Sequence, residues 1–418
     1  MYIEEKLVSG IPVICQQVPN FHSVAIGVWV RAGSVTETDK ENGISHLIEH
    51  MLFKGTEKRS AKQIAIDMDN LGGQINAFTA KECTCYYIKV IDEKMKEGIE
   101  VLSDLFLNSK FDAAELEKEK GVVLEEIAMY NDTPDEVAHE LISATFFKET
   151  LLEKAILGPA ENIKAFSRDD IVNYKNKYYG TENIVIAVAG NFDKNRLMDT
   201  LNEYFCEDCG PDAQKANLEI KNLRMEKKNA FAMRDIEQAH LCMAFPGCAY
   251  EDPRRFALSV LNNILGASMS SRLFQKIREE RGMAYSVYSY PSLYSTTGMF
   301  SIYAGTTLKN MQTVMELIVG ELQKMKKDKI TNEEFLQSKE QLKGNYILAL
   351  ENTSAKMNAI GKGKLLTGKL TTEEETIELV NKVSLEDTIS LIDSLINFDA
   401  CTITAVGKEN IKIEDLKI

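Results

Sequence analysis

The chain has 418 residues, and 44% of them are hydrophobic, as is usual in globular proteins. A chain of this length is longer than one hydrophobic core usually supports, so we expect two or more domains. Its formal net charge of -14 argues against nucleic-acid and anionic-membrane partners, because both require basic patches. Eight cysteines are too sparse for a disulfide scaffold in so long a chain, and we expect reduced thiols, including Cys206 and Cys209 of a lone C-x-x-C.

The start of the chain, MYIEEKLVSG, has no basic segment followed by an apolar run. No later stretch approaches the roughly 20 consecutive apolar residues that span a bilayer. We therefore expect a cytoplasmic protein that has no membrane partner.

The first half of the chain combines strands and helices in an irregular order. The second of its helices begins after Ser60 and ends at Gly72-Gly73. A later helix starts at Thr133-Pro134, because proline is tolerated at the first helical position. After a strand near residue 23 we expect, in order, helices at 43–54 and 60–71, strands across 74–90, and an acid-rich helix at 112–130.

Two segments of the chain repeat, one near the end of each half. SRDDIVNYKNKYYG leads into NIVIAVAG, which ends at Gly190, and SLEDTISLIDSL leads into CTITAVG, which ends at Gly407. In each, a serine followed by acids caps a helix and a β-branched run predicts a buried strand. SVAIGVWV near residue 23 likewise has its counterpart in HLCMAF from His240, so the chain is interpreted as a duplication.

The halves are joined by a polar segment that contains Gly210-Pro211 and suits an exposed connection. We predict an N-terminal domain over residues 1–209, a linker over 210–228 and a C-terminal domain over 229–418. Strands and helices are mixed without strict parallel alternation, which favours an α+β fold of sheets covered by helices over a doubly wound fold.

The helix expected at 43–54 carries His46, Glu49 and His50 within GISHLIEHMLFKGT. Residues four apart lie one helical turn above each other, so both imidazoles can reach one metal ion about 2.0 to 2.1 Å away. Glu49 shares this face and can accept a proton from metal-bound water as a general base. The structural alternative is an amphipathic helix with a solvated polar face, which gives no reason for histidines at this spacing.

A catalytic zinc usually has three protein ligands, so the motif predicts a further His, Glu or Asp elsewhere. The acid-rich helix at 112–130 is the candidate source, and Glu119 and Glu126 share one of its faces, two turns apart. Helical geometry alone does not choose between Glu125, Glu126 and the other acids, because a run of acids is usually a solvated face.

HLIEH followed by MLFKGT, together with VVLEEIAMY, resembles the inverted-motif zinc peptidases of the pitrilysin family, in the branch that includes mitochondrial processing peptidase and its bacterial relatives. The resemblance covers essentially the whole chain. It implies one Zn²⁺ per chain held by His46, His50 and Glu126, with Glu49 as the base and Glu119 orienting the ligands or the water. It also implies two homologous domains, each a mainly antiparallel sheet covered by helices.

Two further matches to this family concern the substrate. QINAFTAKECTCYY resembles the family's edge strand, on which an extended peptide adds as a further strand; an ordinary hairpin strand is the alternative. The resemblance implies hydrogen bonds from the backbone of Asn76, Ala77, Phe78 and Thr79. SSRLFQKIREERGMAYSV resembles the family's arginine-tyrosine segment, which implies that Arg278 and Tyr285 grip substrate carbonyls and help stabilise the oxyanion. Without the resemblance, these two would be interpreted as a surface charge and a core aromatic.

FALSVLNNILGAS, the counterpart of the metal-binding helix in the second half, has neither His nor Glu, so only one half can chelate. The resemblance implies a homodimer in which each composite site takes its metal ligands from one subunit and Arg278 and Tyr285 from the other. We expect a zinc metalloendopeptidase that cleaves extended or unfolded peptides. The alternatives are a catalytically inactive peptide-binding or assembly subunit of the same fold and, less favoured, a structural zinc site, which normally has four ligands, often cysteines.

Overall fold

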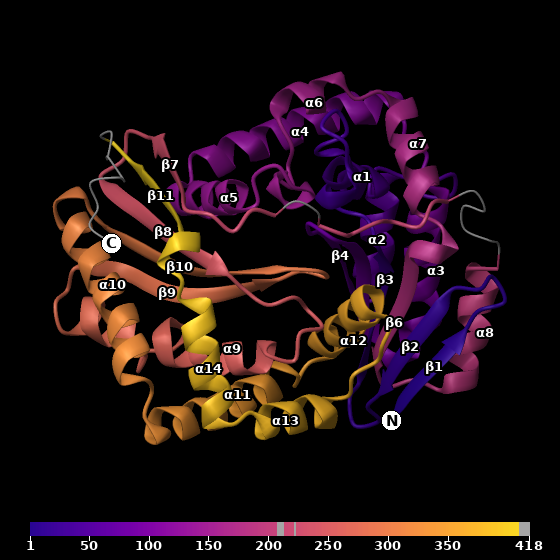
Figure 1. The fold of residues 1–418 in the computed structure, drawn as a ribbon. Helices are drawn as coiled ribbons and strands as arrows, with labels where there is room; N and C mark the ends of the chain where they lie inside the picture. Colours follow the sequence, from indigo (N-terminus) through magenta and orange to yellow (C-terminus); the bar gives the residue numbers. More distant parts are fainter. Residues whose placement is uncertain (207–212, 221–222, 409–418) are drawn as a thin grey trace. The chain divides into compact units, whose positions relative to one another are not determined.

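The computed structural model describes residues 1–206, 213–220 and 223–408, which form two compact units (Figure 1). Unit 1 consists of Met1–Ile127, Lys154–Leu218 and Ile347–Thr372, and unit 2 consists of Ala128–Glu153, Glu219–Tyr346 and Glu373–Ile418. Each unit is one sheet with helices packed against it. Of the helices in the described ranges, none combines the length and the hydropathy needed to cross a membrane.

Unit 1 contains a six-stranded sheet with the strand order β1-β2-β6-β3-β5-β4. Neighbouring strands pair antiparallel except β2 and β6, which run parallel. The strands are β1 (Tyr2–Lys6), β2 (Pro12–Gln17), β3 (Ser23–Val30), β4 (Gln74–Thr79), β5 (Thr84–Ile91) and β6 (Ile184–Gly190). β4 therefore lies at one edge of this sheet, paired only with β5.

Both faces of the unit 1 sheet are buried, and the alternation along β3 shows how. Val24 and Ile26 belong to a core shared with the helices of one face, whereas Ala25 and Trp29 belong to a second core shared with Met357. The helices of this unit are α1 (Ile44–Leu52), α2 (Ala61–Asn70), α3 (Met95–Asn108), most of α4 (Ala113–Asn131), α6 (Ala160–Ala165), α7 (Arg168–Tyr178), α8 (Lys194–Tyr204) and α12 (Thr353–Thr367). The helices predicted at 43–54, 60–71 and 112–130 are thus confirmed as α1, α2 and α4.

Unit 2 contains a five-stranded sheet with the order β7-β11-β8-β10-β9, in which only β7 and β11 run parallel. Its strands are β7 (Lys228–Met233), β8 (Gln238–Pro246), β9 (Ala284–Leu293), β10 (Gly298–Thr307) and β11 (Thr402–Gly407). Its helices are α5 (Pro134–Phe146), α9 (Arg255–Asn262), α10 (Met311–Asp328), most of α11 (Asn332–Ala349), α13 (Glu373–Lys382) and α14 (Leu385–Leu395), with π-helical turns at Asn263–Ala267 and Phe274–Glu279. The order repeats β2-β6-β3-β5-β4 of unit 1, so the predicted duplication and the α+β fold class are confirmed.

The repeated helix and strand near the end of each half have the same local structure. Ser167 caps α7 and Ser384 caps α14, each in a capping box with an aspartate three residues later. Asp170 and Asp387 donate their main-chain N–H groups to these serines at 3.2 and 3.0 Å. β6 and β11 follow the two helices, as predicted, and both strands are completely buried.

Each unit includes one helix from the other half of the sequence (Figure 1). α12 packs on β2, β3 and β6 of unit 1, where Met357 Sδ accepts a hydrogen bond from Trp29 Nε1 at 3.3 Å. Gly361 allows this close approach, since a Cβ there would lie 2.2 Å from Trp29 Nε1. α5 packs on β7, β8 and β11 of unit 2, and its His139 side chain lies 2.7 Å from the Tyr290 hydroxyl.

The predicted domain limits do not include this exchange of helices and stay a prediction. Of the predicted linker, residues 210–212 and 221–222 lie outside the described residues, as does Cys209. The seven cysteines within the described residues are free thiols, six of them buried and Cys206 exposed.

Candidate metal centre

The first turn of α1 is held by a buried carboxylate from outside the helix. α1 follows Gly43, whose φ of 100° is left-handed and which offers no side-chain cap. Glu37 instead accepts hydrogen bonds from the main-chain N–H groups of Gly43 and Ser45, and from the Asn42 amide, all at 2.9 Å. Burial raises the pKa of Glu37, and these hydrogen bonds oppose the rise. Glu37 thereby orients the helix that carries His46. It lies six residues before the N-cap residue Gly43, so the local sequence pattern of a helix cap does not reveal it.

His46, His50 and Glu126 come together in unit 1, and their donor atoms all lie within 4.8 Å of one another. Glu126 Oε2, from α4, is 3.7 Å from His46 Nε2 and 3.5 Å from His50 Nε2. These separations are long for direct hydrogen bonds, whereas tetrahedral zinc ligands at their usual bond lengths lie about 3.3 Å apart. The three side chains therefore fit around a single ion of this kind.

The protonation state of His46 suits metal binding. Burial, helped by the neighbouring His50, lowers the pKa of His46 to about 4. A neutral imidazole keeps the lone pair that a metal requires. Nδ1 of His46 is buried without a hydrogen-bond partner among the described residues. The ring is therefore oriented by packing and by the Glu126 carboxylate on its Nε2 side.

His50 is oriented by Glu119, the acid that the resemblance places beside the metal. Nδ1 of His50 lies 2.9 Å from Glu119 Oε1, and Nζ of Lys54 lies 2.6 Å from Glu119 Oε2. A carboxylate that accepts the Nδ1 proton leaves the lone pair on Nε2, the nitrogen that faces Glu126. Lys54 was not predicted from the sequence, although it follows the end of α1 and lies four residues, about one turn, after His50.

Glu49 lies beside the three donors without belonging to them. Its Oε2 accepts a hydrogen bond from the Thr79 hydroxyl of β4 at 2.5 Å. Burial raises the pKa of Glu49 and the Glu126 carboxylate adds to the rise, whereas the Thr79 hydrogen bond and His50 oppose it. A half-buried carboxylate in this position is suited to act as a general base for a water at the three donors.

β4 is the edge strand beside this group, and its pairing with β5 shows which of its main-chain groups face the open edge. The Ala80 N–H donates across the hairpin toward the β5 side at 2.8 Å. Because hydrogen-bonded pairs alternate along an antiparallel ladder, Phe78 and Asn76 also direct their main-chain groups to β5. Ala77 and Thr79 direct theirs to the open edge, and Asn76 Oδ1 accepts from the Ala77 N–H at 2.8 Å. Two of the four predicted substrate-binding residues, Ala77 and Thr79, thus direct main-chain groups to the open edge, and of these groups the Ala77 N–H already donates to its neighbour's side chain.

Arg278 and Tyr285 lie together in unit 2. Tyr285 sits where the pairing of β9 with β10 shifts register, and it is 77% exposed, so it is not a core aromatic. The Arg278 guanidinium carbon lies 5.3 Å from the centre of the Tyr285 ring and 4.8 Å from that of Phe274. These cation–π contacts hold the arginine and the tyrosine as a pair.

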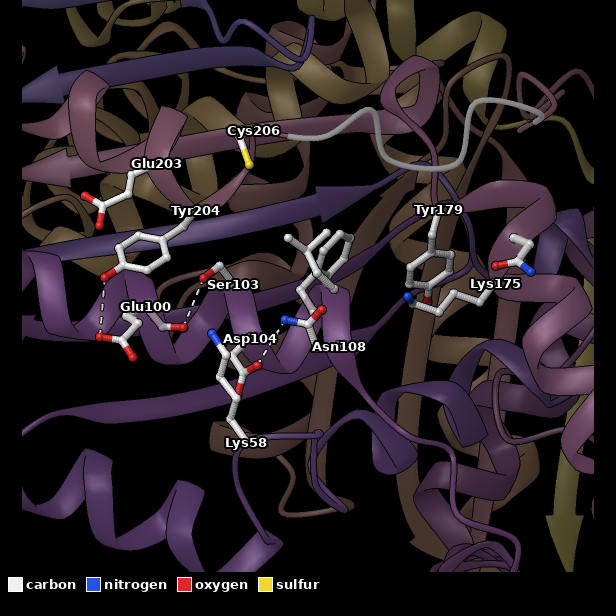
Figure 2. A pocket seen from close by; sticks show the side chains of 13 residues that line it. Lys58, Glu100, Ser103, Asp104, Asn108, Lys175, Tyr179, Glu203, Tyr204 and Cys206 are labelled. Carbon is white, nitrogen blue, oxygen red and sulfur yellow. Dashed lines mark hydrogen bonds between the residues drawn. The ribbon is translucent and has the colours of Figure 1, made fainter.

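A cavity of about 480 Å³ lies elsewhere in unit 1 and is lined by residues of α3, α7 and α8 (Figure 2). Its carboxylates are already bonded: Asp104 accepts from Arg59 at 2.8 Å and from Asn108 at 3.0 Å, and Glu100 accepts from Arg59 at 2.7 Å. None of its lining residues belongs to the three-donor group. Within the part of the chain that the structure describes, His46, His50 and Glu126 are the group that could hold a metal ion.

An inverted H-x-x-E-H helix completed by a glutamate from a second helix is the donor set of the inverzincin class of metallopeptidases. The family profile described as Insulinase (Peptidase family M16) matches residues 12–160, and that of the Peptidase M16 inactive domain matches residues 165–342. The chain is 44% identical to the uncharacterized zinc protease YmxG of Bacillus subtilis, over 94% of this chain and 95% of that protein. The chain therefore belongs to peptidase family M16, and the resemblance to this family is confirmed.

A second relative and a solved structure are also similar to this chain. An uncharacterized zinc protease of Streptomyces coelicolor is 37% identical over 91% of this chain and 84% of its own length. The crystal structure of a protease from Helicobacter pylori, 20% identical in sequence, superposes with a TM-score of 0.88 over 97% of this chain and 99% of that chain. This last likeness shows that the two-unit fold is shared.

Proposed function

We propose that this chain is a zinc endopeptidase that cleaves extended or unfolded peptides. The observation that carries the proposal is the convergence of His46, His50 and Glu126 beside the carboxylate of Glu49. Relatives that are named zinc proteases support zinc as the ion. His46, His50 and Glu126 would hold the zinc, which would supply Lewis-acid chemistry: a lower pKa, toward 7, for a bound water and polarisation of a peptide carbonyl.

The residues of the chain have separate tasks in this proposal. The substrate adds as a strand to the open edge of β4, which Ala77 and Thr79 face with main-chain groups; the Ala77 N–H would exchange its bond to Asn76 Oδ1 for one to the substrate. Glu49 accepts a proton from the attacking water and returns it to the leaving amine. Arg278 and Tyr285 bind the substrate carbonyl and stabilise the developing oxyanion.

The proposal is tested by zinc content and peptide cleavage of the purified protein. We expect about one zinc per chain, cleavage of a quenched peptide library, loss of cleavage with a chelator and recovery with added zinc. A protein that holds no zinc and cleaves nothing would instead be the peptide-binding or assembly subunit considered as the alternative.

Glu119 offers a test of the proposed centre from outside the three ligands. Glu119→Gln keeps the shape of the side chain but weakens its hold on His50, so we expect zinc affinity to fall about 10- to 100-fold. Zinc competition with a chromogenic chelator measures the change. Glu117→Gln, an exposed position on α4 whose partner is Lys120 at 2.6 Å, is the matched control and should bind zinc as the wild type does. Equal zinc affinities for the two variants would contradict the orienting role.

We further propose a homodimer with composite sites, in which Arg278 and Tyr285 act on the metal group of the partner. Glu49→Gln and Tyr285→Phe chains should then each be impaired, and mixed dimers should contain one intact site. After dissociation and random reassociation, we expect about a quarter of wild-type cleavage. The measurement is peptide cleavage after mixing, with each variant alone as the control. Activity no greater than the mean of the separate variants would rule out the composite site.

The remaining predictions about partners and location rest on the sequence. The net charge of -14 supports the expectation of no nucleic-acid or anionic-membrane partner. The cytoplasmic location stays a prediction, and fractionation of cells that express the full chain would test it.

A further inference from the structure

Thr79 connects the open edge of β4 with the carboxylate of Glu49. Its hydroxyl donates to Glu49 Oε2 at 2.5 Å. The other hydroxyl nearby, Thr84 Oγ1, lies 3.5 Å from Thr79 Oγ1 and donates to the Ala32 carbonyl at 2.9 Å. The Thr79 hydroxyl therefore donates its hydrogen bond to Glu49.

The main chain and the side chain of Thr79 point in different directions. Its N–H and C=O groups lie in the plane of the sheet and face the open edge, where a peptide strand would pair. Its side chain stands perpendicular to the sheet, on the face of β4 against which α1 packs. Pairing of a substrate with β4 thus leaves the hydroxyl free to keep its hydrogen bond to Glu49.

We propose that Thr79 is a positioning residue for Glu49, an inference that rests on the proposed function. A carboxylate on a flexible side chain can present either oxygen, and its side chain can rotate. The short hydrogen bond from Thr79 holds Oε2 and leaves Oε1 as the oxygen that can accept a proton from the reacting water. The side chain of Thr79 thereby acts on the base, while its main chain contacts the substrate.

Two substitutions of Thr79 separate these contributions. Thr79→Val keeps the β-branched shape and removes the hydroxyl, so we expect kcat to fall about 10- to 100-fold, the usual effect of losing a hydrogen bond to a charged group. KM for an extended peptide and zinc content should match the wild type, because the backbone of β4 and the three donors are unchanged. Thr79→Ser keeps the hydroxyl and should restore kcat to within about threefold of the wild type.

Thr402→Val is the matched control, because Thr402 is a buried strand threonine of unit 2 whose hydroxyl has no partner among the described residues. It should retain the kcat of the wild type. A Thr79→Val variant with unchanged kcat, with a raised KM alone, or with lost zinc would overturn the positioning role, as would a Thr79→Ser variant as slow as Thr79→Val.

Crystal structures of the two Thr79 variants give a readout that does not depend on activity. The Glu49 carboxylate should keep its orientation in Thr79→Ser and rotate in Thr79→Val. An unmoved carboxylate in Thr79→Val contradicts the inference even if the protein proves to be no peptidase. A wild type that cleaves no peptide contradicts the proposed function alone, so the two failures are distinguishable.

Discussion

The Glu49→Gln variant is expected to bind zinc like the wild type and to lose peptide cleavage, with kcat lower by about 100- to 10,000-fold. Glutamine has nearly the same shape but does not accept a proton at neutral pH. Glu49 is not one of the three donors, so its charge is not needed to hold the ion. The loss should therefore appear in kcat while zinc content stays near that of the wild type.

The measurement combines zinc analysis with kcat and KM on one extended peptide. Glu57→Gln is the control, because Glu57 is an exposed acid of unit 1 that stands outside the metal group. Cleavage at the wild-type rate by Glu49→Gln would remove Glu49 from the role of base. Loss of zinc would instead make Glu49 part of the metal-binding set.

The Glu126→Gln variant is expected to lose both zinc and cleavage. Glu126 supplies the only carboxylate of the three-donor group in the described residues, and its Oε2 lies 3.5 Å from the Nε2 atom of His50. An amide is a weaker ligand than a carboxylate for zinc, and it brings no negative charge to the ion. We expect zinc affinity to fall by more than about 100-fold, beyond the effect of losing an outer partner.

Glu125→Gln is the matched control for this variant. Glu125 is the neighbouring residue on α4, carries the same side chain, is exposed and does not belong to the three-donor group. Titration of the zinc-free variants with zinc, followed by a cleavage assay, should show wild-type behaviour for Glu125→Gln. The opposite result, with zinc lost from Glu125→Gln and kept by Glu126→Gln, would make Glu125 the third ligand in place of Glu126.

The local elements that carry the centre could be predicted from the sequence. The helix that holds His46 and His50 follows from its spacing and periodicity, and the repeated capping boxes at Ser167 and Ser384 revealed the duplication. Such features depend on side chains within one or two turns of each other, so a short stretch of sequence specifies them. The choice of Glu126 over Glu125 needed the resemblance to a family, because both lie on one helix among other acids.

Contacts between distant segments were decided only by the tertiary structure. The exchange of α5 and α12 between the units depends on how whole sheet faces are covered, and no local signal shows which sheet a helix will join. The hydrogen bond from Thr79 to Glu49 and the contact of Lys54 with Glu119 likewise join separate elements. By itself the sequence determined the duplicated α+β fold and the spacing of the two histidines, because these are local patterns repeated along the chain. The packing of β4 and α4 against α1 determined which carboxylates and hydroxyls lie around the two histidines and Glu49, because those partners come from segments far apart in the sequence.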